Sequence, residues 1–254
     1  MRVTILGSGT SAGVPTLGCR CEVCRSTNPK NKRMRASIYL EQGDARILID
    51  CGPDFRTQAL LRGISDVSDL LLTHTHADHL NGLDDLRSYN MIHGHPIDVY
   101  GTAATLDDVR QRFAYCFRPP APGGGIPQLD LVEFQPGQPI VVGGIEVLPL
   151  QVYHGKLPIV GFRIGSLGYF TDVSTMPDET VDALRGVDVL ITSALRHRPH
   201  PTHMSLEQAQ ELVRRIEPRQ AYFTHMCHDL EHEATNRALP PGMALLYDGL
   251  SFEV

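Results

Sequence analysis

The sequence predicts an α/β protein in which two mixed β-sheets pack face to face between outer layers of helices. Three observations support this fold class. Short runs rich in β-branched and aromatic residues alternate with stretches in which apolar residues recur at helical spacing. Two such sets of runs follow each other, separated by the Pro- and Gly-rich stretch RPPAPGGGIPQ. The length of 254 residues, 42% of them hydrophobic, suits one large domain with a sizeable core.

The first set of elements precedes the Pro- and Gly-rich stretch. Strands are predicted at RVTILG, ASIYLE, ARILIDC and DLLLT, because each of these runs is followed by turn residues. Residues 55–62 and 83–92 have apolar residues at helical spacing and are predicted to be helices.

The second set repeats the pattern. Strands are predicted at GGIEVLPLQV, IVGFRIG, LGYFTD, DVLITS and QAYFTH. Helices are predicted over residues 178–185 and 206–216, the latter opened by Ser205 as its N-cap. Residues 118–128 are interpreted as a long surface loop rather than a linker, because strands of the same style lie on both sides. We therefore expect residues 1–254 to form a single domain.

Composition and charge argue against several classes of protein. The net charge of −6 offers no general attraction to nucleic acid or anionic membranes. No apolar run approaches the ~18 residues that span a bilayer. The N-terminal stretch MRVTILGSGTSAGVP reads as a strand entering a glycine loop, not as a secretory signal. Six cysteines are too few for a disulfide scaffold, so we expect a cytoplasmic protein.

The most distinctive stretch is LLLTHTHADH, in which an apolar run ends in the ligand-type residues His74, His76, Asp78 and His79. Successive side chains of a strand alternate between its faces, so His74 and His76 point the same way. Imidazole and carboxylate together suit zinc, manganese or iron. The alternative is a polar loop that is rich in histidine by chance. Four ligand-type residues within six positions at a strand end argue against it.

Three later strands end in the same way. His154 follows PLQVY, Asp172 ends LGYFTD, and His225 ends AYFTH. One such residue after one strand is usually structural. Three of them, in a chain that already has a ligand cluster, favour a single metal site to which distant segments contribute.

HTHADH followed by His154, Asp172 and His225 in this order resembles the metallo-β-lactamase superfamily, over nearly the whole chain. The resemblance implies a four-layer αββα sandwich with a dinuclear metal site at one edge. It also implies the ligand sets, namely His74, His76 and His154 for one metal, Asp78, His79 and His225 for the second, and Asp172 as the bridge. Asp50 in LIDCG matches an aspartate that supports this site from behind the ligands, with an ordinary strand-end turn as the alternative.

Such a pair of cations would define a type of reaction. Two divalent metals about 3.5–4 Å apart lower the pKa of a shared water and stabilise the charge on attacking and leaving oxygens. A bridging carboxylate at Asp172 would partly neutralise the repulsion between them. This chemistry hydrolyses phosphodiesters, thioesters and lactams alike, so the ligands alone leave the substrate open.

The stretch GTSAGVPTLGCRCEVC contains three closely spaced cysteines, Cys19, Cys21 and Cys24. Three thiols within six residues suggest a structural zinc, which needs a fourth ligand. Three unpaired cysteines are the alternative. His228 and Cys227, both just after the last predicted active-site ligand, are suitable fourth ligands.

The glycine loop leading into C-x-C-x2-C, together with HTHADH and a terminal TH-x2-H, resembles the PhnP phosphodiesterases of the carbon–phosphorus lyase pathway. The resemblance implies a structural zinc held by Cys19, Cys21, Cys24 and His228, and so favours His228 over Cys227. It implies hydrolysis of 5-phosphoribosyl 1,2-cyclic phosphate to ribose 1,5-bisphosphate in phosphonate catabolism. Related members also open 2′,3′-cyclic nucleotides. Manganese is the implied active-site metal, and the same ligands accept zinc.

The segment SALRHRPHPTHMSLEQA carries several cationic side chains, namely Arg196, His197, Arg198, His200 and His203. We interpret Arg196, Arg198 and His200 as candidate substrate contacts in a phosphate-binding loop, with a solvated basic loop as the alternative. His203 matches an active-site histidine of the PhnP pattern. We predict that it protonates the leaving oxygen, a role for which the unperturbed pKa of histidine, near ~6.5, is suitable. Asp78 and His203 are thus the predicted catalytic residues.

Two functions of other classes stay open. A nuclease of the tRNA-processing kind shares HxHxDH, but this acidic chain lacks the basic block that RNA binding usually needs. A non-hydrolytic accessory protein of a cofactor pathway would keep the fold without turnover, and the complete ligand set argues against it. As partners we expect a small phosphorylated substrate, no membrane, no strong nucleic-acid binding, and a homodimer as one compatible assembly.

Overall fold

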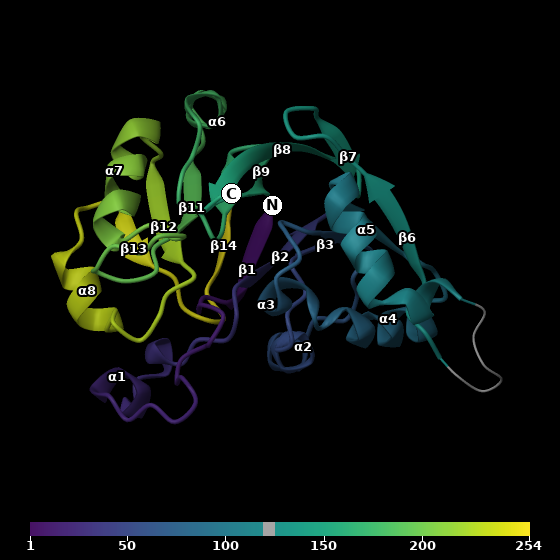
Figure 1. Cartoon of the computed structure of the whole chain (residues 1–254), viewed down its shortest axis with the longest axis horizontal. Coiled ribbons are helices and arrows are strands. Elements are labelled where there is room, and N and C mark those ends of the chain that lie inside the picture. The colour runs from purple at the N-terminus through teal and green to yellow at the C-terminus, as the bar shows by residue number, and fades with distance from the viewer. Residues whose placement is uncertain (119–124) are drawn as a thin grey trace.

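The computed structural model describes residues 1–118 and 125–254 and contains two seven-stranded β-sheets (Figure 1). The first sheet has the order β14-β1-β2-β3-β4-β5-β6, and the second has the order β13-β12-β11-β10-β9-β8-β7. The strands of the first sheet are β1 (Arg2–Gly7), β2 (Ser37–Gln42), β3 (Ala45–Ile49), β4 (Asp69–Leu71), β5 (Ile97–Gly101), β6 (Leu129–Glu133) and β14 (Ser251–Glu253). Those of the second are β7 (Ile140–Val142), β8 (Ile145–His154), β9 (Leu157–Ile164), β10 (Leu167–Phe170), β11 (Val189–Ser193), β12 (Gln220–Thr224) and β13 (Met243–Leu245).

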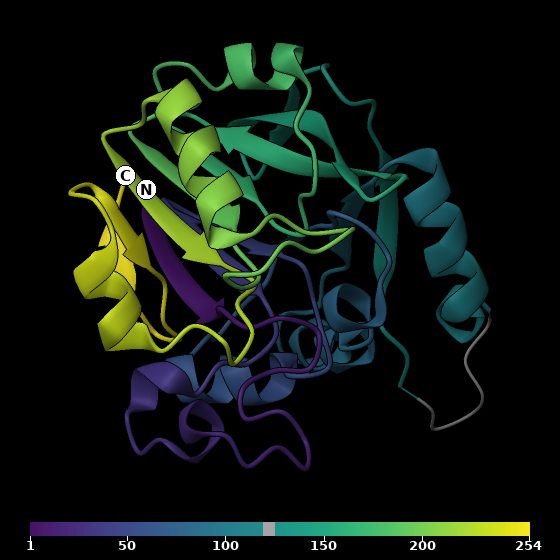
Figure 2. The ribbon, with the colours of Figure 1, turned by 60° about the vertical axis from the view of Figure 1, so that its left-hand side comes forward.

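Helices cover the outer face of each sheet. The first sheet is covered by α2 (Phe55–Arg62), α3 (Ala77–Leu80), η2 (Leu83–Leu86), α4 (Arg87–His93) and α5 (Ala103–Arg112), whose apolar residues share a core cluster with its strands. The second is covered by α6 (Asp178–Ala183) and α7 (Leu206–Ile216), and Figure 2 shows α7 lying across its strands. The remaining helical elements are α1 (Glu22–Arg25), η1 (Pro29–Asn31), η3 (Ala114–Phe117) and α8 (His232–Ala238). The predicted αββα sandwich is therefore confirmed.

The apolar run that ends in HTHADH is explained by the layering. Leu70 and Leu72 pack into the core cluster under the outer helices, whereas Leu71 packs into the main core between the sheets. Alternate side chains of a strand point to opposite faces, and both faces of β4 are covered. A continuous apolar run is what such a strand requires.

Each sheet combines antiparallel and parallel pairs. β1, β2 and β3 pair antiparallel, whereas β3 to β6 are parallel neighbours. In the second sheet β7 to β10 pair antiparallel, whereas β10 to β13 are parallel. The carboxyl ends of parallel strands meet at one edge, which is where ligands gather in open α/β sheets. The ends of β3, β4, β10, β11 and β12 all lie at such edges.

Most predicted elements are found close to their expected bounds. The helix over 55–62 is confirmed as α2, and the helix over 206–216 is confirmed as α7, with Ser205 forming a capping box with Gln208. The helix predicted over 83–92 is divided into η2 and α4. Within the loop predicted at 118–128, residues 119–124 lie outside the described residues. Among the described residues, none of the helices combines the length and apolar character that crossing a bilayer requires.

Candidate metal centre

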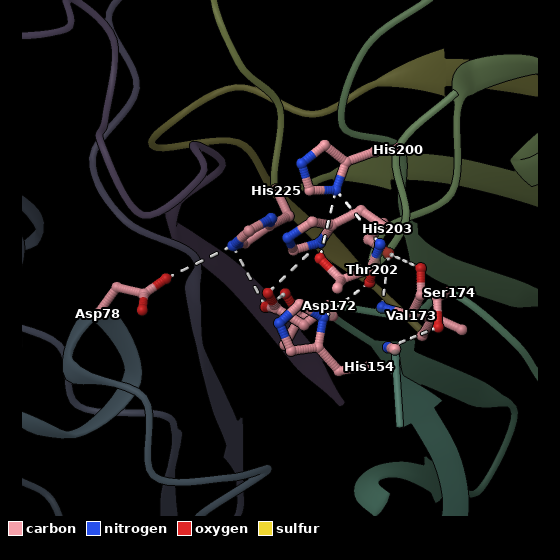
Figure 3. A network of polar contacts seen from close by, with 12 residues as sticks. Asp78, His154, Asp172, Val173, Ser174, His200, Thr202, His203 and His225 are labelled. Carbon is pink, nitrogen blue, oxygen red and sulfur yellow. Dashed lines mark hydrogen bonds and ion pairs between the residues drawn. The ribbon is translucent and has the colours of Figure 1, made fainter. Parts of the chain in front are cut away.

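The predicted metal ligands meet at the strand ends, and Figure 3 shows four of them, Asp78, His154, Asp172 and His225. The turn after β4 supplies His74 and His76, and the short helix α3 supplies Asp78 and His79. The second sheet supplies His154, Asp172 and His225 from the ends of β8, β10 and β12. Ligand atoms lie within 4.8 Å of one another in three overlapping groups, His74–His79–Asp172, Asp78–His79–His225 and His154–Asp172–His203. The ring of His76 lies against those of His74 and His154, with centroids 4.6 and 5.1 Å away.

The atoms at the centre are spaced like ligands of a common cation. His79 Nε2 lies 3.1 Å from Asp78 Oδ2 and 2.9 Å from Asp172 Oδ2. His225 Nε2 lies 3.5 and 3.2 Å from the same two oxygens. Two atoms that each lie ~2.1 Å from a tetrahedral ion are about 3.4 Å apart. The buried Nε2 of His74 has no hydrogen-bond partner, which buried polar atoms seldom tolerate. The donor set therefore fits divalent metals.

Polar groups behind the ligands orient their rings. His79 Nδ1 donates to Asp50 Oδ2 at 2.7 Å, which leaves Nε2 facing the site. Thr73 donates to the same carboxylate through its Oγ1 at 2.8 Å and its backbone N at 2.9 Å. His154 Nδ1 donates to the carbonyl of Thr202 at 2.7 Å. Asp50 thus lies where the resemblance implied. Thr73 and Thr202 were missed, because a lone threonine carries no signal of this role.

Three residues of the site have left-handed backbone conformations, with φ of 61° at Asp50, 57° at Asp172 and 56° at His225. Such values are uncommon for residues other than glycine and persist where the surrounding structure enforces them. Asp50 and His225 directly follow β3 and β12, and Asp172 lies two residues after the end of β10. Gly52 adds a close approach, because a Cβ at this position would lie 2.0 Å from the carbonyl oxygen of Asp78. The turn after β3 therefore packs backbone to backbone against the HTHADH turn.

The charged groups of the site shift one another's pKa values. Burial opposes the charged form of Asp172, but His225 and His79 hold its pKa well below the usual range. Burial also opposes the charged form of His79, but Asp172 and Asp50 raise its pKa well above the usual value. The pKa of His74 is lowered well below its usual value by burial and then by His79. A carboxylate anion at Asp172 and a neutral imidazole at His74 are the forms that bind metals.

His203, on the loop after β11, lies directly against the ligands (Figure 3). Its Nδ1 is 3.6 Å from Asp172 Oδ1, and its ring stacks on that of His225 with centroids 5.0 Å apart. Burial, followed by His225, lowers the pKa of His203 to about 3. The unperturbed value near ~6.5 therefore does not describe His203 in the protein without substrate, because sequence position does not reveal burial. His203 is a neutral imidazole at pH 7.

The cationic loop is only partly directed at the site. The ring of His200 lies beside that of His203, with centroids 5.1 Å apart. Arg196 donates to carbonyls of its own loop, those of Arg198 at 3.2 Å and Pro199 at 3.0 Å. Arg198 pairs with Asp229 at 3.4 Å. Substrate contact by these residues stays a prediction.

A further cation, which the sequence did not indicate, lies beside the HTHADH turn. Arg112, at the end of α5, donates from Nη1 to the carbonyl of Thr75 at 2.7 Å. Its Nε and Nη2 pair with Asp108 at 2.9 and 2.8 Å, and 40% of its side chain is exposed. Thr75 stands between two predicted ligands, so this guanidinium lies at the rim of the site. No spacing rule connects it to residues so distant in the sequence.

The four residues of the predicted zinc site also lie together. His228 Nδ1 is 3.2, 3.6 and 3.3 Å from the sulfur atoms of Cys19, Cys21 and Cys24. The backbone N–H groups of Thr16 and Cys24 donate to the sulfurs of Cys24 and Cys21, both at 3.4 Å. Cys227, the rival ligand, instead accepts from the backbone N of Asp229 at 3.4 Å. Three sulfurs and one nitrogen at these spacings fit a tetrahedral structural zinc.

Comparisons with known proteins agree with this architecture. A beta-lactamase superfamily domain model matches residues 45–226. The crystal structure of a new diphosphatase from the PhnP family is 41% identical, and the alignment covers 99% of this chain and 97% of that chain with a TM-score of 0.92. The structure of Zn(2+)-bound PqqB from Methylobacterium extorquens, at 21% identity and a TM-score of 0.80 over 100% of both chains, shares the fold.

Curated relatives are similar over part of their length. An octanoyltransferase of Porphyromonas gingivalis is 41% identical over 253 residues, which is 98% of this chain and 51% of that protein. A ribonuclease Z of Methanopyrus kandleri is 30% identical over 142 residues, 54% of this chain and 46% of that protein. The chain thus spans about half the length of the curated relatives that it matches.

The matches and the site agree with each other. The family model spans the segment from β3 to just beyond β12, which contains all seven predicted ligands of the active site. The PhnP-family structure extends the similarity to the cysteine segment, because it covers nearly the whole of both chains. On these grounds the chain belongs to the beta-lactamase superfamily and, within it, to the PhnP family.

Proposed function

We propose that this metal-dependent hydrolase is a dinuclear phosphodiesterase that opens a small cyclic phosphodiester. Its proposed substrate is 5-phosphoribosyl 1,2-cyclic phosphate, and 2′,3′-cyclic nucleotides are further candidates. The supporting observation is that Asp172 belongs to two overlapping groups of possible ligand atoms. A carboxylate has two oxygens, so one that is shared in this way suits two cations side by side rather than one cation alone.

The cations would be bound by side chains from both sheets. The first would be held by His74, His76 and His154, the second by Asp78, His79 and His225, and Asp172 would lie between them. When bound, two divalent metals supply Lewis-acid stabilisation of the phosphate and lower the pKa of water. Manganese or zinc suits these nitrogen and oxygen donors. A structural zinc at the cysteine site completes the proposed metal content.

The protein's own groups would position the substrate and move protons. Asp78 Oδ2, which lies between His79 and His225, can accept a hydrogen bond from the attacking water. His203 can donate an N–H to a phosphate oxygen. An anionic substrate beside it would raise its pKa, so that it could take up a proton and deliver it to the leaving sugar oxygen. The exposed part of Arg112 can bind a second, non-reacting phosphate.

Hydrolysis of a diphosphate linkage is the second candidate. The PhnP-family protein that is 41% identical to this chain is described as a diphosphatase. Both reactions displace an oxygen from phosphorus and can use the same ligands. They differ in the leaving group, because a phosphate leaves more readily without a proton than a sugar alkoxide does. Dependence on His203 should therefore distinguish them.

A substrate screen of the manganese-loaded protein tests the proposal. The panel contains the cyclic phosphate, a 2′,3′-cyclic nucleotide, a diphosphate, a linear diester, a thioester and a precursor tRNA. We expect the highest kcat/KM for a cyclic phosphate and at least a ~10²-fold loss in Asp172→Ala. Asp182→Ala is the matched control, because Asp182 is exposed and pairs with Arg185 away from the site. Preference for the diphosphate would favour the second candidate, and activity that survives metal removal would refute both.

A further inference from the structure

Arg33 is a charged side chain buried beside the two predicted metal sites. Only 2% of its surface is exposed. Burial lowers its pKa to about 10, which leaves the guanidinium charged at neutral pH. Its Nη1 donates to the carbonyl of Cys227 at 2.9 Å and its Nη2 to that of Leu230 at 2.7 Å. The planar fork of arginine can hold two carbonyls at once, so this side chain is suited to fixing the shape of a loop.

The loop that Arg33 holds connects the two metal sites. It begins at His225, whose Nε2 lies 3.2 Å from Asp172 in the active site. It continues to His228, whose Nδ1 lies 3.2 Å from the sulfur of Cys19. Cys227, whose carbonyl accepts from Arg33, stands between these two histidines.

Other contacts restrain the same loop. The backbone N of Met226 donates to Ser8 at 3.0 Å, and the backbone N of Cys227 donates to Leu195 at 2.9 Å. Arg33 itself exchanges two backbone hydrogen bonds with Val14, at 2.7 and 2.8 Å, on the segment that leads to the cysteines. Figures 1 and 2 show this segment around α1 alongside the chain that enters α8. The backbone between His225 and His228 is therefore restrained on several sides, so a displacement of one histidine should also displace the other.

We propose that Arg33 is a positioning residue that couples the cysteine site to the active site. By fixing the loop at Cys227 and Leu230, it makes an ordered cysteine site hold His225 in place for an active-site cation. The inference rests on the proposed metal sites and is independent of the proposed substrate. Coupling of this kind is reciprocal, so each site should strengthen metal binding at the other.

Manganese titration of arginine variants tests the coupling. Free Mn²⁺ is measured by electron paramagnetic resonance, and zinc in the cysteine site by elemental analysis. We expect Arg33→Met to raise the Kd of the more weakly bound active-site Mn²⁺ by at least about 10-fold. Arg33→Lys should have an intermediate effect, because an ammonium group can donate a well-aligned hydrogen bond to only one of the two carbonyls. Arg163→Met is the matched control, since Arg163 also donates to a backbone carbonyl, that of Ala183, outside this loop.

The control should bind Mn²⁺ within about twofold of the wild type, well below the 5–150-fold typical of coupled sites. An Arg33→Met protein that is folded, keeps its zinc and binds Mn²⁺ as tightly as the wild type would overturn the proposal. Wild-type protein that fails to bind Mn²⁺ would overturn the metal centre and the coupling together. Normal Mn²⁺ binding and normal coupling without cyclic-phosphate turnover would count against the proposed substrate alone.

A measurement on the wild type covers the case in which Arg33→Met does not fold. A zinc-specific chelator is titrated against the cysteine site, with and without saturating Mn²⁺. We expect Mn²⁺ to raise the chelator concentration needed for half removal by at least about fivefold, and Arg33→Lys to reduce this shift. An unchanged midpoint in the wild type would overturn the proposal.

Discussion

At the scale of single residues, the proposed chemistry depends on how burial changes a side chain. His203 is the clearest case, because its burial, followed by the neighbouring His225, lowers its pKa to about 3. A neutral imidazole cannot give up a proton until substrate has changed its surroundings. The same residue would be an ordinary general acid on an exposed loop.

Replacement of His203 should therefore have an effect that depends on the leaving group. We expect His203→Ala to slow the opening of a cyclic phosphate by at least ~10²-fold, because a sugar alkoxide leaves poorly without a proton. The loss should be smaller for bis(p-nitrophenyl) phosphate, whose phenolate needs no proton. Steady-state kinetics at fixed metal content provide the measurement. Equal losses for both substrates would mean that His203 positions the substrate or supports a metal. Ligand atoms of His203, His154 and Asp172 lie close together, so support of a metal is the main alternative role of His203.

At the scale of elements, the strand ends were predictable and several connections were not. The apolar strands and the polar residues directly after them are visible as local patterns, which is why β4, β10 and β12 were placed with their ligands. α5 was not predicted, because its apolar stripe is narrow, with Leu106 and Val109 as its buried apolar residues. The role of Arg33 was also invisible, since a charged residue in a loop is usually exposed. Contacts between residues far apart in sequence leave no periodic signal in a single chain.

The element around α1 should depend on its metal for order. Within α1 only Cys24 is buried, and the segment that contains α1 and η1 contributes no strand to either sheet. We expect Cys19→Ser and His228→Ala to lower the melting temperature clearly, because binding energy at a structural zinc is partly folding energy. The folded fraction should keep near-normal turnover per bound active-site metal, although coupling predicts that it binds these metals more weakly.

Cys116→Ser is the control for this comparison, because Cys116 is a buried cysteine in the core under the outer helices. It should change the melting temperature without changing zinc content. Unchanged melting of Cys19→Ser together with lost turnover would contradict a structural role for the cysteine site.

At the scale of the whole molecule, the two ends of the chain pair with each other at one edge of the first sheet. β14 pairs with β1, and the N-terminal nitrogen donates to the carbonyl of Val254 at 2.8 Å. Just before β14, Asp248 accepts hydrogen bonds from Ser8 N at 2.9 Å, Ser8 Oγ at 2.7 Å and Met34 N at 2.7 Å. This carboxylate ties the last segment to the glycine loop that leads toward the cysteines.

Asp248 should make stability depend on pH. Protein atoms surround most of the Asp248 carboxylate, although part of the residue is exposed, and burial raises its pKa from 3.8 to about 6. Below pH 3.8 it is protonated in both folded and unfolded states, and between these values the folded state binds more protons. Its contribution therefore weakens as pH rises from about 4 to about 6, by at most ~3 kcal/mol and by less because the side chain is partly exposed.

Unfolding of the wild type and of Asp248→Asn, measured from pH 4 to 7, isolates this effect. The variant loses a hydrogen bond at every pH, but it lacks the titration. The wild type should therefore lose stability relative to Asp248→Asn as the pH rises. Asp182→Asn is the exposed control, and parallel profiles for wild type and Asp248→Asn would contradict the raised pKa.

The division of the active-site ligands between the two sheets has a mechanical consequence. Packed sheets are held in register by apolar side chains that tolerate exchange for others of similar size. A slip of one sheet along the other by a single residue would move its atoms by ~3.3 Å. Such a slip would part His79 from Asp172 and Asp78 from His225 at the same time, since each pair spans the seam. Metals bound there would cross-link the two sheets, and the geometry of the ligands would then fix the alignment of one sheet on the other.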